Sequence, residues 1–328
     1  MLKFGIVSTA NIGVAHVIPA IQNASNCMVA AIASRDRKKA RKVARQFDVP
    51  LTFGSYEELL ESDEIDAVYI PLPTSQHVEW TLKAAAAGKH VLCEKPIALK
   101  AAEIKSLIKA RDKHGVVVSE AFMVTYHPQW LKVRELISKG SIGKLRHVQA
   151  SFAYHNLDAT NMRNMVELGG GVIPDIAVYP VVGTRFATGA EPVRLHSTVV
   201  FDPKFKTDCY ATIQAEFEDF DLSFYVSTQM ALRQTIAFHG DKGFIELTAP
   251  FNSNLYAGDE LRLHNQDHSE VRCFSYTGVD QYQCQVEAFA RVCAGKKQPL
   301  FSLEDSYANQ RVVDAIYKSS EKSAWVKV

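Results

Sequence analysis

The first third of the chain alternates short apolar runs with segments of helical periodicity, and this alternation restricts the possible folds. Five apolar runs have the length of buried strands, at residues 4–7, 28–33, 67–72, 90–93 and 116–119. Helices are predicted at residues 12–21, 37–47, 74–88 and 101–114. Ser55 and Glu58 form a further helix-capping pattern. Because parallel strands need long, usually helical connections, the alternation predicts an α/β fold with a doubly wound parallel sheet.

The alternation of strands and helices stops after about residue 122, where apparent strands follow one another with fewer helices between them. These strands are predicted at residues 145–153, 193–201, 210–217, 222–228, 234–239 and 244–247. A final helix is predicted over residues 303–322. Successive strands of this kind favour a mainly antiparallel sheet. We therefore expect two domains, residues 1–122 and residues 123–328, the second of α+β type.

The charge balance gives no broad electrostatic reason to bind a polyanion. The 328 residues include 37 basic and 36 acidic side chains, for a net charge of +1. We expect no nucleic-acid partner, and we find no run of the roughly 20 apolar residues that a membrane span needs. The six cysteines lack the spacing of a zinc site or a C-x-x-C motif, so we expect no metal and reduced thiols. A cytoplasmic protein is the resulting prediction.

The turn after the first predicted strand has the position of a dinucleotide-binding turn. Such turns usually read G-x-G-x-x-G, because glycines let backbone amides at a helix N-terminus approach a pyrophosphate. Here the first two glycines are replaced by the small residues Ser8 and Ala10, and only the third, Gly13, is kept. The predicted contacts to the cofactor are Ser8, Thr9, Ala10, Asn11, Ile12 and Gly13. An ordinary strand–helix connection is the alternative.

The end of the second predicted strand indicates which dinucleotide is bound. NAD-binding units usually place an acidic residue there, to bond the ribose hydroxyls. This chain has Ser34 and Arg35, which can bond a 2′-phosphate, and a guanidinium can also stack on adenine. NADP is therefore predicted over NAD, although the following Asp36 could take the ribose role. The basic residues 37–39 are interpreted as a solvated helix start.

Several motifs along the chain resemble one oxidoreductase family. They are Asp66–His77, Ala86–Pro96 with its E-K-P ending, Glu120–Met123, His127–Gln129, Asn161–Arg163, Glu167–Gly171 and Asp175–Pro180. Together they resemble the Gfo/Idh/MocA (glucose–fructose oxidoreductase/inositol dehydrogenase) family. The match is closest to the dimeric dihydrodiol dehydrogenases and the NADP-dependent D-xylose dehydrogenases. The resemblance implies a Rossmann domain followed by an α+β domain with a large open sheet. Because an open apolar sheet face needs cover, we predict a homodimer formed through that sheet.

The resemblance also implies roles for individual residues. Lys95 would lie beside the nicotinamide and stabilise charge on the substrate oxygen, and Tyr179 would act as acid and base where inositol dehydrogenases have histidine. Asp175, four residues before Tyr179, would share its face if the segment is helical, and it would orient the substrate or tune the lysine. Further cofactor positions are Pro71, Leu72, Thr74, His77 and Glu94. Tentative substrate positions are Phe122, His127 and Arg163, which could equally be packing or surface residues.

The implied activity is a hydride transfer between NADP and a carbinol or carbonyl carbon of a sugar, polyol or cyclic trans-diol. A non-catalytic NADP-binding regulator with the same fold is the alternative from another functional class. A sugar-to-sugar oxidoreductase with tightly held cofactor is a further alternative. The substrate and the direction of the reaction do not follow from the sequence.

Overall fold

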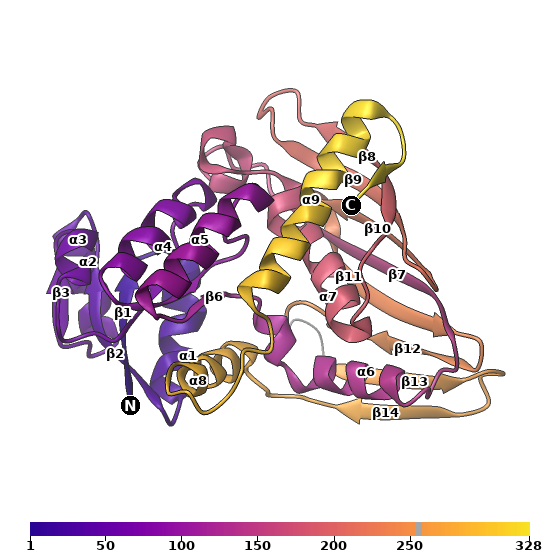
Figure 1. The fold of residues 1–328 in the computed structure, drawn as a ribbon, viewed down its shortest axis with the longest axis horizontal. Coiled ribbons are helices and arrows are strands. Elements are labelled where there is room, and N and C mark those ends of the chain that lie inside the picture. Colours follow the sequence, from indigo (N-terminus) through magenta and orange to yellow (C-terminus); the bar gives the residue numbers. More distant parts are fainter. Residues whose placement is uncertain (254–257) are drawn as a thin grey trace. The chain divides into compact units, whose positions relative to one another are not determined.

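The computed structural model describes residues 1–253 and 258–328, which form two compact units (Figure 1). The first unit contains Met1–Met123 and Asp280–Tyr307. The second unit contains Val124–Val279 and Ala308–Val328. The chain therefore leaves the first unit, builds most of the second, returns to the first and finishes in the second.

The first unit is built on a six-stranded parallel sheet with the order β3-β2-β1-β4-β5-β6. Its strands are β1 (Leu2–Val7), β2 (Cys27–Ala33), β3 (Leu51–Phe53), β4 (Ala67–Ile70), β5 (His90–Cys93) and β6 (Val118–Glu120). The order runs outward from β1 to β3 and then reverses to β4, which is the doubly wound topology of a Rossmann fold. The predicted parallel sheet is confirmed. The short strand β3 was not predicted.

Helices cover both faces of this sheet, and each face has its own apolar core. They are α1 (Ile18–Asn23) with the preceding π-helix η1 (Gly13–Val17), α2 (Arg37–Gln46), α3 (Tyr56–Leu60), η2 (Thr74–Gln76) with α4 (His77–Ala86), and α5 (Ala101–His114). The central strands β2 and β4 are apolar throughout because both of their faces are buried. The predicted cap of α3 is present, since the Ser55 hydroxyl accepts the Glu58 amide at 3.1 Å.

Residues 280–307 belong to the first unit, which corrects the predicted assignment of this segment to the second domain. Its helix α8 (Gln281–Cys293) buries Val286 and Phe289 in the core that contains Phe4. The Phe4 and Phe289 rings lie 5.7 Å apart between centroids. The apolar face of a helix indicates that the helix is buried, but it does not indicate which core the helix joins.

The second unit is built on a nine-stranded sheet with the order β14-β13-β12-β11-β7-β10-β9-β8-β15. Its strands are β7 (Leu145–His155), β8 (Arg194–Phe201), β9 (Asp208–Glu216), β10 (Asp221–Ser227), β11 (Gln229–Gly240), β12 (Gly243–Leu247), β13 (Glu260–Asn265), β14 (Val271–Ser275) and β15 (Val326–Lys327). Among the described residues of this sheet, β7 and β10 are the one pair that runs in parallel. The predicted mainly antiparallel sheet is confirmed, whereas β13, β14 and β15 were not predicted.

The helices of the second unit pack on one face of its sheet. They are α6 (Pro128–Ser138), α7 (Val178–Thr188) with the preceding π-helix η6 (Ile173–Ala177), and the part of α9 (Leu303–Lys322) that follows Tyr307. Alternate residues of β7, among them Val148, Ala150 and Phe152, are buried. The helical segment Val166–Thr188 has the length and composition of a membrane span, contrary to the sequence analysis, but most of it is buried inside the protein. Its burial in this core accounts for its apolar composition.

Candidate active site

The turn that follows β1 keeps its shape without the first two glycines of the usual motif. Ser8 has a φ of 102°, a backbone conformation that favours glycine. Its hydroxyl accepts the amide of Ala10 at 3.2 Å, which holds the tight turn from within. Gly13 follows in the first helical turn, where a Cβ atom would lie 3.5 Å from the Tyr69 ring. The turn therefore brings backbone amides to a helix N-terminus at the carboxyl end of a central strand.

Two residues that follow β2 have different surroundings: Asp36 caps a helix, whereas Arg35 is exposed. The Asp36 carboxylate accepts the amides of Lys38 and Lys39 at 2.9 and 3.4 Å and so caps α2. Ser34 is buried, and its hydroxyl accepts the Asp36 amide at 3.2 Å. Arg35 is exposed and hydrogen-bonds Tyr56. The capping role of Asp36 weakens the alternative in which Asp36 binds a ribose. Arg35 is then the favoured candidate for distinguishing NADP from NAD.

Lys95 lies in the segment Glu94–Leu99 after β5, here called the Lys95 loop. Lys95 is half-buried, and the peptide bond to Pro96 is cis. Glu94 accepts the Tyr69 hydroxyl at 2.6 Å and the Lys95 amide at 3.3 Å. Its carboxylate is therefore fixed from β4 and supports the lysine through the backbone.

His77 lies below the Lys95 loop and has no polar atom left for a cofactor. Its side chain is buried, with Nδ1 2.8 Å from the Pro96 carbonyl and Nε2 2.7 Å from the Leu72 carbonyl. Pro71, Leu72 and Thr74, which were also predicted to contact the cofactor, are buried as well. Both ring nitrogens of His77 therefore contact the backbone of two loops, and its contact with the cofactor stays a prediction.

In the second unit, Asp175 is the centre of a polar cluster. Its Oδ2 accepts the Tyr154 hydroxyl at 2.5 Å and pairs with Nε of Arg163 at 2.9 Å. Burial and the Asp175 charge raise the pKa of Tyr154, and the same carboxylate raises the pKa of the Arg163 guanidinium. The predicted residues Asp175 and Arg163 are thus brought together. Tyr154, at the end of β7, was missed because its strand was predicted to stop two residues earlier.

Tyr179 lies on α7, one helical turn after Asp175. It is 4% exposed, and its ring packs 5.6 Å from the rings of both Phe152 and Phe251. Arg163 interacts electrostatically with its phenol. The helix that carries both residues starts as the π-helix η6, a distortion that is frequent at functional sites. The phenol is therefore held in an apolar wall beside a positive charge.

A buried carboxyl that the sequence did not reveal fixes the start of this helix. Asp208 is 2% exposed, accepts the Tyr317 hydroxyl at 3.0 Å and lies 3.5 Å from the Ile173 amide. Burial raises the pKa of Asp208 to about 7, an effect that Tyr317 and the backbone amides oppose. A Cβ atom at Gly171, where φ is +135°, would come within 2.3 Å of this carboxyl. Gly171, which precedes the helix, therefore makes room for Asp208.

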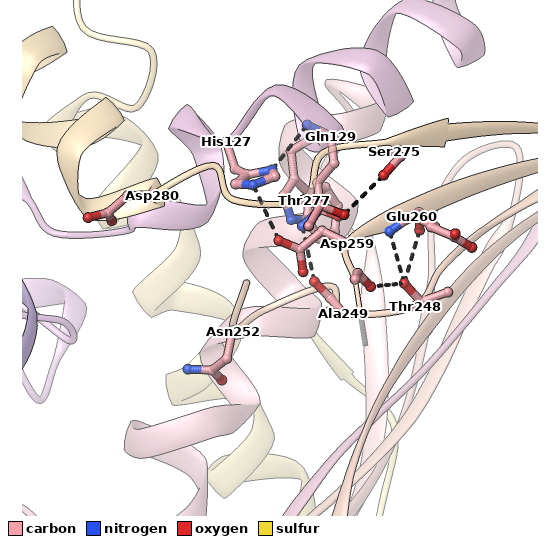
Figure 2. Close-up of polar contacts among 12 residues, drawn as sticks. His127, Gln129, Thr248, Ala249, Asn252, Asp259, Glu260, Ser275, Thr277 and Asp280 are labelled. Atoms are coloured by element: carbon pink, nitrogen blue, oxygen red, sulfur yellow. Dashed lines mark hydrogen bonds and ion pairs between the residues drawn. The ribbon is translucent and has the colours of Figure 1, made fainter. Parts of the chain in front are cut away.

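Two tentative substrate residues are buried packing residues in this structure. Phe122 is fully buried against Phe301 in an edge-to-face contact. His127 caps α6, because its Nδ1 accepts the Gln129 amide at 3.2 Å, and its Nε2 lies 3.9 Å from the buried Asp259 (Figure 2). Burial lowers the pKa of His127 to about 4, so the ring is neutral near pH 7. Neither side chain presents an exposed atom to a ligand.

Comparison with known proteins identifies the family of the chain. Residues 2–122 match the Gfo/Idh/MocA oxidoreductase family with its NAD-binding Rossmann fold, and residues 130–246 match the C-terminal domain of the same family. Two full-length relatives and one solved structure extend the match.

The relatives are named as sugar and diol dehydrogenases. The D-xylose 1-dehydrogenase (NADP(+)) 2 of Haloferax volcanii is 36% identical, with 100% of both chains covered. The trans-1,2-dihydrobenzene-1,2-diol dehydrogenase of Xenopus laevis is 29% identical over 95% of this chain and 96% of its own. The 3-ketoreductase KijD10 of Actinomadura kijaniata, in complex with NADP and TDP-benzene, has a TM-score of 0.89 and 26% identity over 97% of both chains. The chain therefore belongs to the Gfo/Idh/MocA family of oxidoreductases.

Proposed function

We propose that the chain is an NADP-dependent dehydrogenase or reductase that acts on a CH–OH group of a sugar, polyol or cyclic trans-diol. The observation that carries the proposal is the setting of Tyr179. Its phenol lies one turn after Asp175, beside the charge of Arg163, on a helix whose start is fixed by a buried carboxyl. The names of the relatives agree with this class of substrate.

The first unit has the residues to hold the cofactor. The small side chains of Ser8 and Ala10 support an approach of a pyrophosphate to the amides of the first helical turn, and the exposed Arg35 would bond a 2′-phosphate. Glu94, fixed by Tyr69, supports the loop of Lys95. When bound, the nicotinamide supplies or accepts the hydride.

The protein's own groups handle the proton and the charge. During oxidation, the Tyr179 phenolate accepts the hydroxyl proton of the substrate, and during reduction the phenol returns it. The positive charge of Arg163 favours the phenolate form. The Lys95 ammonium stabilises the negative charge that develops on the reacting oxygen. Asp175, with Tyr154 and Arg163, orients the hydroxyl groups of the substrate.

Turnover assays test this proposal. The purified protein is incubated with NADP+ or NAD+ and a panel of pentoses, hexoses, inositols and cyclic trans-diols, and the absorbance of reduced nicotinamide is followed. We expect reduction of NADP+ with at least one sugar or diol. Tight NADP binding without turnover on any compound would contradict the proposal and favour a regulator.

Replacing Arg35 with alanine tests the cofactor preference. The loss of a charge-assisted bond to the 2′-phosphate is expected to raise KM for NADP+ about 10- to 100-fold, with little change for NAD+. Steady-state kinetics with both cofactors measure the effect. Arg41→Ala, at an exposed arginine of the helix α2 that follows, is the matched control. An equal rise in KM for both cofactors would contradict the assignment of Arg35.

A homodimer formed through the open face of the nine-stranded sheet is part of the proposal. Midway along β7, β9, β10 and β11 the side chains on that face are uncharged, whereas Asp221, Arg233 and Glu246 lie around them. The uncharged residues are Gln149, Ser151, Thr212, Gln214, Ser223, Tyr225, Thr235 and Ala237. Few charges at the centre of a surface are typical of an interface. Val200, 46% exposed on β8, adds apolar area. The cytoplasmic location also stays a prediction.

Light scattering tests the dimer. We expect twice the monomer mass of 36.5 kDa at micromolar concentration, because the sheet face is covered by its copy. Val200→Lys should shift the mass toward the monomer, since it places a charge in the interface. Leu131→Lys, at an exposed leucine of α6 on the helix-covered side, should leave the mass unchanged. A wild-type monomer at this concentration would exclude the proposed dimer.

A further inference from the structure

The Lys95 loop has no regular secondary structure, and side chains contact several of its backbone polar groups. The Pro96 carbonyl faces Nδ1 of His77 at 2.8 Å, and the Ile97 amide donates to Oε1 of Glu120 at 2.9 Å. These are the two residues that follow Lys95. His77 begins α4 and Glu120 ends β6, so the loop is held from two different elements of the first unit.

Both side chains that hold the loop are titratable and almost fully buried. His77 is 1% exposed and Glu120 is 4% exposed. A buried ionisable group is costly unless its contacts repay its desolvation, and core packing alone would be served better by apolar residues. The use of a histidine and a glutamate at these two positions therefore indicates a role beyond packing.

The contacts of His77 require a particular protonation state. Both of its partners, the Pro96 and Leu72 carbonyls, are acceptors only, whereas a neutral imidazole has a single N–H group. Burial and the Lys95 charge lower the pKa of His77, and the two carbonyls oppose that shift. In the neutral ring only one carbonyl receives a hydrogen bond, so the ring links the Leu72 turn to the Lys95 loop in a proton-dependent way.

Glu120 faces charged and polar groups from each neighbouring element. These are Lys95 and Glu94 in the loop, the Ile97 amide, the Ser306 hydroxyl of α9 and the Cys93 thiol of β5. Burial raises the pKa of Glu120 to about 7, while Ser306, the Ile97 amide and Lys95 act in the opposite direction. The carboxylate form accepts the Ile97 amide and attracts the Lys95 ammonium, and the neutral form loses that attraction.

We propose that His77 and Glu120 are positioning residues that clamp the Lys95 loop, one through the Pro96 carbonyl and the other through the Ile97 amide. The clamp fixes the backbone on which Lys95 is carried, and the Glu120 charge, which attracts the Lys95 ammonium, makes the position of that ammonium depend on pH. The inference rests on the proposed function only where it assigns Lys95 the charge that stabilises the reacting oxygen.

Hydrogen–deuterium exchange of the Lys95 loop tests the clamp without any need for turnover. Glu120→Ala removes the acceptor of the Ile97 amide and His77→Phe removes both ring nitrogens, so each should speed exchange in the loop about 10-fold. His77→Asn is the milder substitute if the phenylalanine variant does not fold. His90→Asn is the matched control, because His90 accepts the Val117 amide and does not touch the loop. Unchanged exchange in both clamp variants would overturn the proposal.

Kinetics of Glu120→Gln separate positioning from a purely structural role. The amide oxygen still accepts the Ile97 amide, so the loop stays held while the charge is lost. We expect kcat to fall about 10-fold with KM for NADP+ nearly unchanged, and the rise of wild-type kcat between about pH 6 and 8 to flatten. A wild-type pH profile retained in Glu120→Gln would overturn the proposal. If wild type shows no turnover, the proposed function fails and loop exchange alone decides the clamp.

Discussion

Replacing Lys95 with alanine or Tyr179 with phenylalanine is expected to lower kcat about 1,000-fold, because each change removes a group that acts in the transition state. The ammonium stabilises charge on the reacting oxygen, and the phenol exchanges its proton. KM for NADP+ should change little, since the proposed contacts to the pyrophosphate and the 2′-phosphate come from the turn after β1 and from Arg35. Stopped-flow and steady-state kinetics with the substrate found in the panel measure both quantities.

The combination of the two substitutions makes this prediction sharper. Groups that act together in one step are strongly non-additive, so the double variant should be only slightly slower than the slower single variant. Lys109→Ala, on exposed α5 surface, and Tyr225→Phe, on half-buried β10 surface, are matched controls expected to keep wild-type rates. Turnover undiminished in either active-site variant would show that another residue performs its role.

The second large effect concerns stability and Asp208. Its pKa is about 7 in the folded chain, against an ordinary value of 3.8, so the folded state holds the proton more tightly than the unfolded state. This stabilisation is complete below about pH 4 and is lost as the pH rises to about 7, a loss of up to about 4 kcal/mol in the free energy of unfolding. Asp208→Asn removes the titration and should flatten this part of the pH dependence.

Denaturant unfolding at a series of pH values measures the difference between the two proteins. Burial raises the pKa of Glu120 as well, so Glu120 also makes the free energy of unfolding fall as the pH rises. Asp208→Asn should therefore remove only part of this pH dependence. The free energy of unfolding of Asp208→Asn, relative to that of wild type, should be higher at pH 8 than at pH 4. At pH 8 wild type must bury a charged carboxylate at position 208, whereas the variant buries a neutral amide at both pH values. Asp221→Asn, at an exposed acid of β10, should follow wild type throughout. A variant curve parallel to wild type would contradict the prediction.

The fold was predictable where burial leaves a local pattern. The five main strands of the first sheet are mostly buried, since helices cover both faces, and their apolar runs were each predicted within a few residues. The strand β3 has three half-buried residues and β14 is mostly exposed at the sheet edge, so neither leaves a clear apolar run. The position of α8 in the first unit depends on contacts with Phe4 that are remote in the sequence.

The candidate site divides in the same way. Lys95, Tyr179, Asp175 and Arg163 stand in motifs that the family resemblance makes visible, and the structure brings Asp175 and Arg163 into contact. Asp208 and Tyr317 lack such a signal, because their role arises only where distant strands and helices meet. His77 was visible as a motif residue, but spacing cannot distinguish a ligand contact from two backbone contacts. The sequence therefore predicted which residues belong to the candidate site better than it predicted which atoms those residues contact.

The return of residues 280–307 to the first unit has a consequence for synthesis on the ribosome. The amino-terminal sheet emerges first, yet Val286 and Phe289, which complete one of its cores, follow only after most of the second unit has been translated. At about 5–20 residues per second, that interval is on the order of ten seconds. During this time the nascent sheet exposes apolar surface that only the later α8 covers, and a chaperone that binds this surface would protect it until release.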